Sequence, residues 1–525
     1  MIKSGRREGW LSLPPHTFKS WTQLNDIELN GIKFAEVSGR GTGVIASRSF
    51  KSKDELRRGS VELDKLMTYV PLYEPEMLMK VPQDMVLSKE TVRRWAAHDA
   101  RFKELLNACP ELIERKARGW ILLFLLYQVT SCNPSTQLPC SRNPFMDYIK
   151  FLPEVSLPTF WSREEQKLLA GTTLLPALNA KLDSLKREFE ILHSGTANIP
   201  WCADNWWIPE ARYWSGTALT FEDWLHLDAA YRSRALEMPN IGDVMVPALD
   251  MANHASEEDI TARYDVDADG NVMLVMKEEK TGAEGDEIFI TYGEKGACEM
   301  LFSYGFLESS RTTASELFLD LSIPDDDPLK FVKKTVATCA PRVRIFDSET
   351  EHRDGGRKDE TQWESDYVWW SCVNEEDGLE FRVLQQTDGE RELAVIWKGA
   401  RVEDPNMIGQ HLKEDELREL FELRAVVMVQ ERVEAQLIKL KENGPSDATD
   451  DTEIRPEVKA SITRLRELEG ELLERAHADL EHQKLRLANS DTVEHFLSNQ
   501  AQQAAAQTVE TVNDEEEDDD TEDFS

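Results

Sequence analysis

Three polar residues interrupt an apolar stretch near the middle of this 525-residue chain. Asp250, Asn253 and His254 stand within "VPALDMANHAS" (246–256), most of whose other residues are apolar. A polar side chain that leaves water loses free energy unless a partner satisfies it, so these three residues should bind something. They could hold a metal ion, a proton, a ligand or one another.

The first two possibilities find little support in the surrounding sequence. A metal site here would have one Asp and one His, with no third ligand at a useful spacing. A hydrolase built on Ser, His and Asp would need a G-x-S-x-G turn, and the chain has none. A cluster that only fastens its own loop stays open as the simplest alternative.

Two other motifs suggest ligands that their context does not support. "GTGVIA" (41–46) matches the dinucleotide fingerprint, but that motif must open a helix, whereas "VIASRSF" continues with β-branched residues. We predict a strand there, with glycines that let a ligand approach the backbone closely; a plain β-turn stays open. "DVDADG" (265–270) begins like a calcium loop, but Met276 stands where the bidentate Glu belongs, so we predict a hairpin turn and no metal site.

The charge of the chain limits its partners. The formal net charge is −37 at pH 7, and only nine of the 98 acidic residues lie in the last 13 residues, so the rest of the chain is acidic as well. Binding to phosphates requires clustered Lys and Arg, which argues against nucleic acid as a direct ligand. The acidity favours a basic partner or a substrate that carries lysine.

Cysteine usage and hydropathy indicate a cellular compartment. The seven cysteines are scattered without a C-x-x-C pair, which is typical of a reduced, intracellular protein without structural zinc. The N-terminal residues lack the apolar region of a signal peptide. The most apolar run, "GWILLFLLYQV" from Gly119, is about half of a membrane span and is better explained as a buried helix. We therefore expect a soluble protein of the cytoplasm or nucleus, with no membrane partner.

The periodicity of apolar residues predicts an α+β chain. We expect β-structure in the first 90 residues, helices from about 90 to 240, and β-structure again from 244 to 292. One predicted helix begins at Thr220 and Asp223, which have capping-box-like spacing, and carries Ser233 and Arg234 near its end. The first β-rich region consists of "IKFAEV" (32–37), "GVIASRSF" (43–50) and "KLMTYVP" (65–71).

The C-terminal half predicts a second set of elements. Residues 366–399 alternate as a three-strand meander, starting with "DYVWWSCV". Helical spacing of leucines predicts two helices at about 412–441 and 455–488, which should form an αα-hairpin. The tail at 491–525 is polar and then acidic, so we expect it to be disordered.

Three segments, taken in order, resemble a SET domain: "GRGTGVIASRSF", "VPALDMANHAS" and "GDEIFITYGEKGACEMLFSYGF". With "YRSRAL" before the second, the resemblance narrows to the subgroup of the Rubisco large-subunit methyltransferase and the ribosomal lysine methyltransferases. It implies a β-rich SET domain at 20–310 with a helical insert at about 90–240. A mostly helical, substrate-binding-like domain at 311–490 should follow, and its β-meander departs from the all-helical expectation.

The resemblance also implies S-adenosyl-L-methionine as the ligand of the central triplet. Asn253 and His254 would grip the adenosine and the methionine amino group, and Asp250 would brace their loop. Arg234 resembles the arginine of the family that pairs with the carboxylate of the cofactor, a role that suits a bidentate guanidinium.

Five further contributions follow from the same resemblance. The backbone at Arg40, Thr42 and Gly43 would contact the methionine end of the cofactor. Tyr292 would border the cofactor and supply the phenol that orients the acceptor amine. Tyr304 would form a wall of the lysine channel or donate a second hydrogen bond. Either tyrosine could instead be a packed core residue.

The implied chemistry requires little acid–base machinery. Methyl transfer from a sulfonium to an amine is an in-line displacement, in which correct alignment can contribute ~7–11 kcal/mol. The lysine must be neutral, although its reference pKa is ~10.4, and a nearby positive charge or an apolar channel lowers that pKa.

The sequence thus predicts a protein-lysine N-methyltransferase that acts on a basic component of the translation machinery, a ribosomal protein or an elongation factor. A protein-histidine methyltransferase and a non-catalytic SET-fold binding module remain the alternatives. The oligomeric state stays open.

Overall fold

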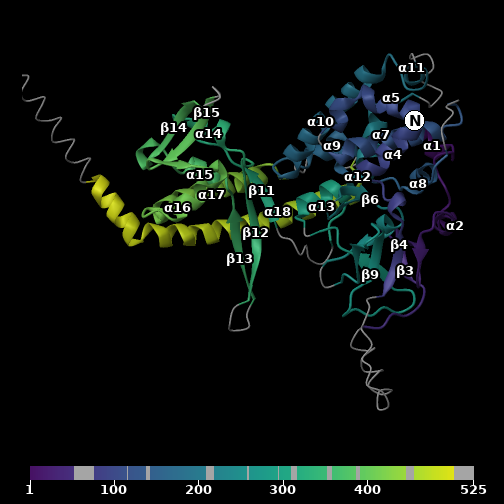
Figure 1. Cartoon of the computed structure of the whole chain (residues 1–525). Coiled ribbons are helices and arrows are strands. Elements are labelled where there is room, and N and C mark those ends of the chain that lie inside the picture. Colours follow the sequence, from purple (N-terminus) through teal and green to yellow (C-terminus); the bar gives the residue numbers. More distant parts are fainter. Residues whose placement is uncertain are drawn as a thin grey trace, which may run out of the picture. The chain divides into compact units, whose positions relative to one another are not determined.

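The chain folds into two compact units. The first consists of Met1–Gln166 and Leu174–Thr313, and the second of Lys167–Thr173 and Ala314–Ser525 (Figure 1). The boundary predicted from sequence lies after residue 310. A computed structural model describes residues 1–501 except 53–75, 115, 137–141, 208–217, 240, 257–258, 294, 309–315, 352–356, 386–390 and 445–453.

The first unit contains two four-stranded sheets. One has the order β1 (Glu28–Leu29), β4 (Met77–Val81), β9 (Val272–Met276), β8 (Ala262–Val266). The other has the order β2 (Ile32–Val37), β3 (Gly41–Ala46), β10 (Glu287–Ile290), β7 (Asn253–His254). Neighbouring strands are antiparallel except β10 and β7, which run parallel. A separate hairpin pairs β5 (Ala235–Met238) with β6 (Gly242–Met245).

Most strands predicted for this unit are confirmed. The glycine-rich motif forms β3 and no helix opens after it, which rules out a dinucleotide-binding turn. The calcium-like motif is the turn between β8 and β9. The predicted strand at 65–71 lies outside the described residues.

Helices cover the region predicted as a helical insert. They are α4 (Lys89–His98), α5 (Ala100–Ala108), α6 (Pro110–Ile113), α7 (Ala117–Cys132), α8 (Phe145–Phe151), α9 (Arg163–Lys167), α10 (Leu174–Thr196), α11 (Pro200–Asn205) and α12 (Phe221–Arg232). Short helices α1 (Ile2–Arg7) and α2 (Phe18–Leu24) precede the sheets, and α13 (Ala297–Tyr304) follows them. The apolar run forms α7, which packs against α4, α8 and α12 and is almost entirely buried. Within the described residues, no helix combines the length and apolarity needed to cross a bilayer.

Helix α12 begins as predicted and ends earlier than predicted. Thr220 and Asp223 form a reciprocal capping box. The helix stops at Arg232, so Ser233 is its C-cap and Arg234 lies beyond it, whereas the sequence placed both in the helix. The reason is that Ala235 already pairs with Met245 at the start of the β5–β6 hairpin.

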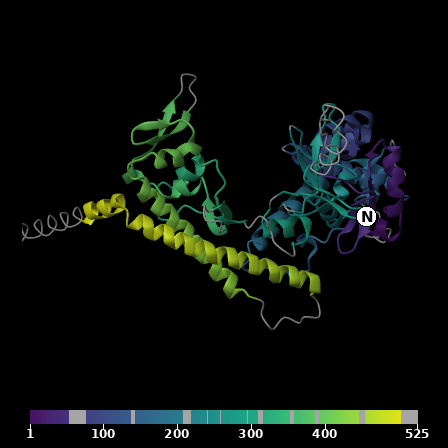
Figure 2. The ribbon, with the colours of Figure 1, turned by 90° about the horizontal axis from the view of Figure 1, so that it is seen from below.

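The second unit combines two small sheets with a long helical hairpin. One sheet has the order β11 (Glu316–Asp320), β12 (Arg342–Glu351), β13 (Arg357–Glu364), and the other β14 (Leu379–Gln385), β15 (Arg391–Trp397), β16 (Ala400–Val402). Its helices are α14 (Lys330–Val336), α15 (Val368–Ser371), α16 (Ile408–Lys413), α17 (Arg418–Glu442) and α18 (Pro456–Ala488). Helices α17 and α18 pack side by side, which confirms the predicted αα-hairpin (Figure 2).

Two predictions for this unit are wrong. The first strand of the meander is instead α15, because Ser365 Oγ accepts a hydrogen bond from the Val368 amide at 3.1 Å and so starts a helical turn. The meander is β14–β15–β16. The tail is helical rather than disordered at residues 491–501, where Val493 is only 1% exposed and anchors the helix. The remainder of the predicted disordered tail, 502–525, lies outside the described residues.

Candidate functional site

A cavity of about 820 Å³ in the first unit gathers five of the nine predicted site residues. Arg40, Asn253, His254, Tyr292 and Tyr304 all line it. The other four do not line the cavity: Thr42, Gly43, Arg234 and Asp250.

The second sheet positions the central motif next to the glycine-rich strand. Strand β7 runs parallel to β10, so that Asn253 lies opposite Phe289 and His254 opposite Ile290. Strand β3 pairs with the other edge of β10. A tight turn leads into β3, and Gly39 in this turn and Gly41 at the start of the strand both adopt φ of 75°, a backbone conformation that favours glycine. The motifs that resembled a SET domain therefore meet in one sheet.

A carboxylate that the sequence did not single out links two of these motifs. Glu287 Oε1 accepts a 2.7 Å hydrogen bond from Asn253 Nδ2, and Glu287 Oε2 lies 3.3 Å from Arg40 Nη1. Gly43 lies directly beneath, because a Cβ there would come within 2.7 Å of Glu287 Oε1 and 3.1 Å of Asn253 Nδ2. Gly43 is thus required by close packing, and Glu287 fixes the orientation of the Asn253 amide.

His254 joins the sheet to the segment that follows it. Its Nδ1 accepts the amide N–H of Tyr292 at 3.0 Å, and its Nε2 lies 2.7 Å from Glu308 Oε1. These partners assign the proton of the neutral ring to Nε2. Burial lowers the pKa of His254 from its usual 6.5, although Glu308 opposes the shift. The imidazole is therefore neutral at physiological pH.

The two tyrosines form an aromatic wall. The Tyr292 hydroxyl donates to Ala252 O at 3.0 Å, the Tyr304 hydroxyl donates to Tyr292 O at 3.4 Å, and their rings lie 4.6 Å apart. Burial raises the pKa of Tyr292 to about 12 and also raises that of Tyr304. Both phenols are thus neutral at physiological pH, and each oxygen retains lone pairs that can accept a hydrogen bond.

Arg234 and Asp250 form a buried pair behind the central motif. Arg234 Nη1 donates to Asp250 O at 2.5 Å and lies 3.5 Å from its carboxylate. Tyr148, on α8, donates to the same carboxylate at 2.6 Å. Asp250 therefore braces its loop, but through Tyr148, which the sequence did not identify. Arg234 Nε is buried and has no hydrogen-bond partner among the described residues, so this guanidinium retains a donor for an anionic group.

Among the described residues, no group of three or more His, Cys, Asp or Glu side chains could hold a metal ion. The lining of the cavity combines hydrogen-bond donors and acceptors, carboxylates and aromatic rings.

Comparison with known proteins supports the resemblance seen in the sequence. No protein-family model matches the chain. It is 25% identical over 370 residues to "SET domain-containing protein 8" of Schizosaccharomyces pombe, covering 69% of this chain and 77% of that protein. It is 26% identical over 346 residues to "N-lysine methyltransferase setd6" of Xenopus laevis, covering 62% and 67%. The predicted resemblance to SET-domain lysine methyltransferases is thus confirmed at the level of sequence relatives.

Solved structures show the same fold. Rubisco LSMT bound to AdoMet matches with a TM-score of 0.57 and 18% identity, covering 91% of this chain and 93% of that one. The SET domain of LSMT bound to lysine and AdoHcy matches with a TM-score of 0.55 and 17% identity, covering 90% and 92%. The chain therefore has the SET fold followed by a largely helical region, and the predicted α+β class is confirmed.

Proposed function

We propose that this protein is an S-adenosylmethionine-dependent protein-lysine N-methyltransferase. The observation that carries the proposal is the meeting of Asn253, His254, Tyr292 and Tyr304 around one cavity of a SET fold. Two further findings support it. Relatives at 25–26% identity include an N-lysine methyltransferase, and structures of the same fold hold AdoMet, or lysine with AdoHcy.

The residues present fit this cofactor. The cavity of about 820 Å³ lies within the range of roughly 300–1,000 Å³ that is usual for small-ligand sites. Glu287 and the Asn253 carbonyl offer acceptors for an amino group. Arg40 lines the cavity and offers donors for a carboxylate, and Arg234, outside the lining, keeps a buried donor without a partner among the described residues. When bound, S-adenosylmethionine supplies a methyl group on a positively charged sulfur, which is already activated for displacement.

The protein then needs to align the acceptor amine. The Tyr292 hydroxyl donates a hydrogen bond to Ala252 O, so its lone pairs are left to accept an N–H of the amine and orient the nitrogen. With a pKa of about 12, Tyr292 acts as a neutral hydrogen-bond partner rather than as a base. The rings of Tyr304 and Phe306 give the cavity one apolar wall, and an amine held against that wall is favoured in its neutral form.

The acceptor protein should be basic. Among the described residues, the lining of the cavity contains one Lys or Arg, Arg40. It contains four carboxylates, those of Asp259, Asp286, Glu287 and Glu308. Together with the net charge of −37, this arrangement favours lysine in a basic sequence. By analogy with the subgroup resembled, we assign the substrate to the translation machinery, as a ribosomal protein or an elongation factor.

Transfer of an isotopic methyl label tests the proposal. The full chain, labelled S-adenosylmethionine and a fraction of basic ribosomal and cytosolic proteins would be combined, and the modified residue identified by mass spectrometry. We expect methyl-lysine in a discrete protein, and loss of both label transfer and calorimetric cofactor binding in Asn253→Ala. Asn443→Ala is the matched control, because its exposed amide donates to the Lys439 carbonyl at the end of α17, in the second unit.

Other results would support the alternatives. Methyl-histidine as the product would identify a histidine methyltransferase. Absence of label together with absence of cofactor binding by the wild-type chain would leave a SET-fold binding module.

A further inference from the structure

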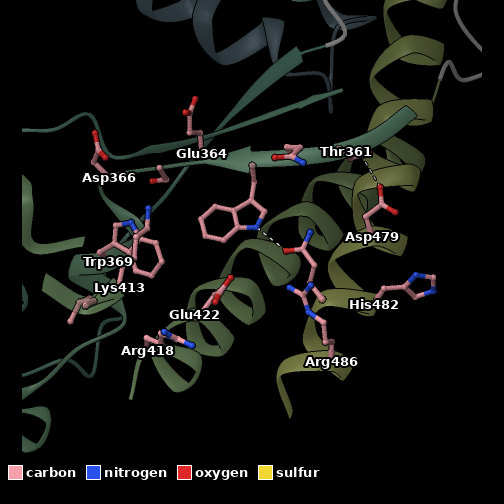
Figure 3. Close-up of a pocket in the computed structure, with 15 residues that line it drawn as sticks. Thr361, Glu364, Asp366, Trp369, Lys413, Arg418, Glu422, Asp479, His482 and Arg486 are labelled. Carbon is pink, nitrogen blue, oxygen red and sulfur yellow. Dashed lines mark hydrogen bonds between the residues drawn. The ribbon is translucent and has the colours of Figure 1, made fainter. Parts of the chain in front are cut away.

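Charged groups line a cavity in each unit, and they differ in how firmly they are fixed. In the second unit, the cavity lies between strand β13 and helices α15, α16, α17 and α18 (Figure 3). Two carboxylates and two guanidinium groups are intermixed on α17 and α18: Glu422, Asp479, Arg418 and Arg486. These charges favour no class of ligand. In the first unit, by contrast, the carboxylate of Glu308 is fixed by a short contact inside the proposed cofactor cavity.

Glu308 is joined to the central sheet through His254. The Tyr292 amide N–H donates to His254 Nδ1 at 3.0 Å, which leaves the proton of the neutral ring on Nε2. That Nε2 lies 2.7 Å from Glu308 Oε1 and donates a hydrogen bond to it. The side chains of His254 and Glu308 are only 6% and 13% exposed, so water competes little for the contact. Because His254 belongs to β7, the contact ties Glu308 to the sheet.

The segment that carries Glu308 depends on this contact for its position. Helix α13 ends at Tyr304, and Gly305 turns the chain away from it with a φ of 82°. Among the described residues, the contact with His254 is the one polar contact that residues 306–308 form. The Phe306 ring approaches the rings of two neighbours at 6.2 and 6.5 Å but stays 37% exposed. A segment with so few ties opens easily when one of them is lost.

The same segment forms one wall of the cavity. Its four consecutive residues all line the cavity: Gly305, Phe306, Leu307 and Glu308. Helix α13 fixes one end of this wall, and the contact between Glu308 and His254 fixes the other. How closely the wall can approach a bound ligand is therefore set at Glu308.

We propose that Glu308 is a positioning residue of the cofactor cavity, which holds residues 305–308 through His254 as a wall against which the ligand binds. The inference rests on the proposed function for the identity of that ligand as S-adenosylmethionine. A wall that is ordered before binding does not have to be ordered at the expense of affinity. Glu308 therefore contributes to cofactor affinity and not to the transfer step.

Calorimetry and steady-state kinetics of the full chain test this role. Glu308→Ala removes the acceptor of the His254 Nε2–H. We expect the Kd and the KM for S-adenosylmethionine to rise about tenfold, the equivalent of one hydrogen bond to a charged group. At saturating cofactor, kcat should stay within about twofold of the wild-type value. Glu279→Ala is the matched control, because Glu279 lies in the same unit, is exposed and does not line the cavity.

Glu308→Gln separates positioning from direct pairing with the ligand. Its side-chain carbonyl can still accept from His254 Nε2 but carries no charge, so its cofactor affinity should lie closer to wild type than that of Glu308→Ala. A carboxylate that paired with a positive group of the cofactor would lose as much affinity in Glu308→Gln as in Glu308→Ala. Equal losses in the two variants, no loss in Glu308→Ala, or a fall in kcat with an unchanged Kd would overturn the inference.

The position of the wall can also be followed without cofactor. Para-fluorophenylalanine incorporated at Phe306 places one fluorine in the wall, and fluorine NMR reports how far that ring is packed or exposed. We expect the resonance to move towards that of an exposed side chain in Glu308→Ala and to stay in place in Glu279→Ala. An unchanged resonance in Glu308→Ala would show that the wall does not depend on this contact. Because no ligand is needed, a wild-type chain that bound no cofactor would count against the proposed function, while the fluorine spectrum would still decide whether Glu308 holds the wall.

Discussion

Tyr292 is the single side chain on which most of the proposed chemistry depends. Tyr292→Phe keeps the ring beside Tyr304 but removes the oxygen that would accept from the amine. We expect kcat to fall roughly 10²-fold, the order of loss that follows when a reacting group is misplaced, while cofactor affinity measured by calorimetry changes little. Tyr264→Phe, outside the cavity, is the control. Equal losses in the two variants would argue that Tyr292 is only a packed core residue.

Protonation of His254 should limit the stability of the site at acidic pH. Its pKa is lowered in the folded chain, so the folded state disfavours protonation. The stability it contributes is complete above pH 6.5 and is lost as the pH falls from 6.5 through the lower folded pKa. Protonation at Nδ1 would face the amide N–H of Tyr292, so protection of that amide from hydrogen exchange should fall in this window.

His254→Gln provides the comparison for that pH dependence, because its side chain does not titrate. The step in Tyr292 amide protection should be absent from this variant and present in His482→Gln, whose ring is exposed and belongs to the other unit. A step that persists in His254→Gln would assign the acid limit to another group.

The sequence identified site residues that belong to short motifs and missed those that act across the fold. Asn253 and Tyr292 were recognisable because their neighbours repeat a known pattern. Glu287 has a role only because β10 pairs with β3 and β7, and Tyr148 reaches Asp250 from 102 residues away. Glu287 lies within the third of the predicted motifs, at the start of a predicted strand, but nothing in the sequence distinguished it from its neighbour Asp286.

Among the secondary-structure elements, the helices of the insert are joined by a buried ionic cluster. Asp228 on α12, whose side chain is 1% exposed, lies 2.6 Å from Arg118 on α7, 2.8 Å from Lys181 on α10 and 3.4 Å from Arg232. Burial alone would raise the pKa of Asp228, but these three cations hold it below its usual value. The cluster is therefore ionised and complete at neutral pH.

Asp228→Asn should destabilise the first unit strongly. Removal of one partner leaves buried cations uncompensated, which typically costs about 3–5 kcal/mol of unfolding free energy. Denaturant-dependent hydrogen exchange of the α12 amides would measure this loss. Asp147→Asn, which breaks a half-exposed pair with Lys150 on α8, should cost less than about 1 kcal/mol. Similar values for both variants would contradict a structural role for the buried cluster.

Helix α18 carries a buried carboxylate whose ionisation should weaken the second unit. Glu469 is 3% exposed and accepts hydrogen bonds from Thr173, and burial raises its pKa from 4.5 to about 7. Between these two values the unfolded chain ionises while the folded chain stays protonated, so stability falls as the pH rises and levels off above about 7.

Glu469→Gln keeps an acceptor for Thr173 without the titration. Relative to the wild type, its unfolding free energy should increase as the pH is raised from 4.5 to about 7, as measured by denaturant-dependent exchange of the α18 amides. Glu467→Gln, exposed on the same helix, should show no such trend. A flat difference for Glu469→Gln would place the pKa of this group near its ordinary value.

Helices and strands could be predicted where the spacing of apolar residues and the length of the segment were clear. The α17–α18 hairpin and strands β2, β3, β8, β9 and β10 follow from apolar spacing. The segment "DYVWWSCV" was misassigned because a run of β-branched and aromatic residues suits either a strand or a fully buried helical turn. The local hydrogen bond from Val368 to Ser365 decided the outcome. Strands β11 to β13 were missed because their charged residues conceal the alternation.

For the whole molecule, the net charge of −37 predicts a salt-dependent reaction. Attraction of a basic substrate acts over about 10 Å at 0.1 M salt and is screened to about 3 Å at 1 M. We expect kcat/KM for the basic protein to fall at least about tenfold from low to high salt, with kcat nearly constant. A lysine peptide with uncharged flanks is the comparison, and an equal salt dependence for it would contradict electrostatic recruitment.

The second unit cannot be exchanged as one continuous segment of the chain. Lys167–Thr173 belongs to the second unit, although the residues before and after it in sequence belong to the first. Its carbonyls at Ala170 and Gly171 bind Arg466 and Gln436, and Thr173 binds Glu469. A recombination that joined a different C-terminal half at residue 313 would leave this loop behind without its partners. Changes in the second unit are therefore easier to reach by substitution within it than by exchange of the unit as a whole.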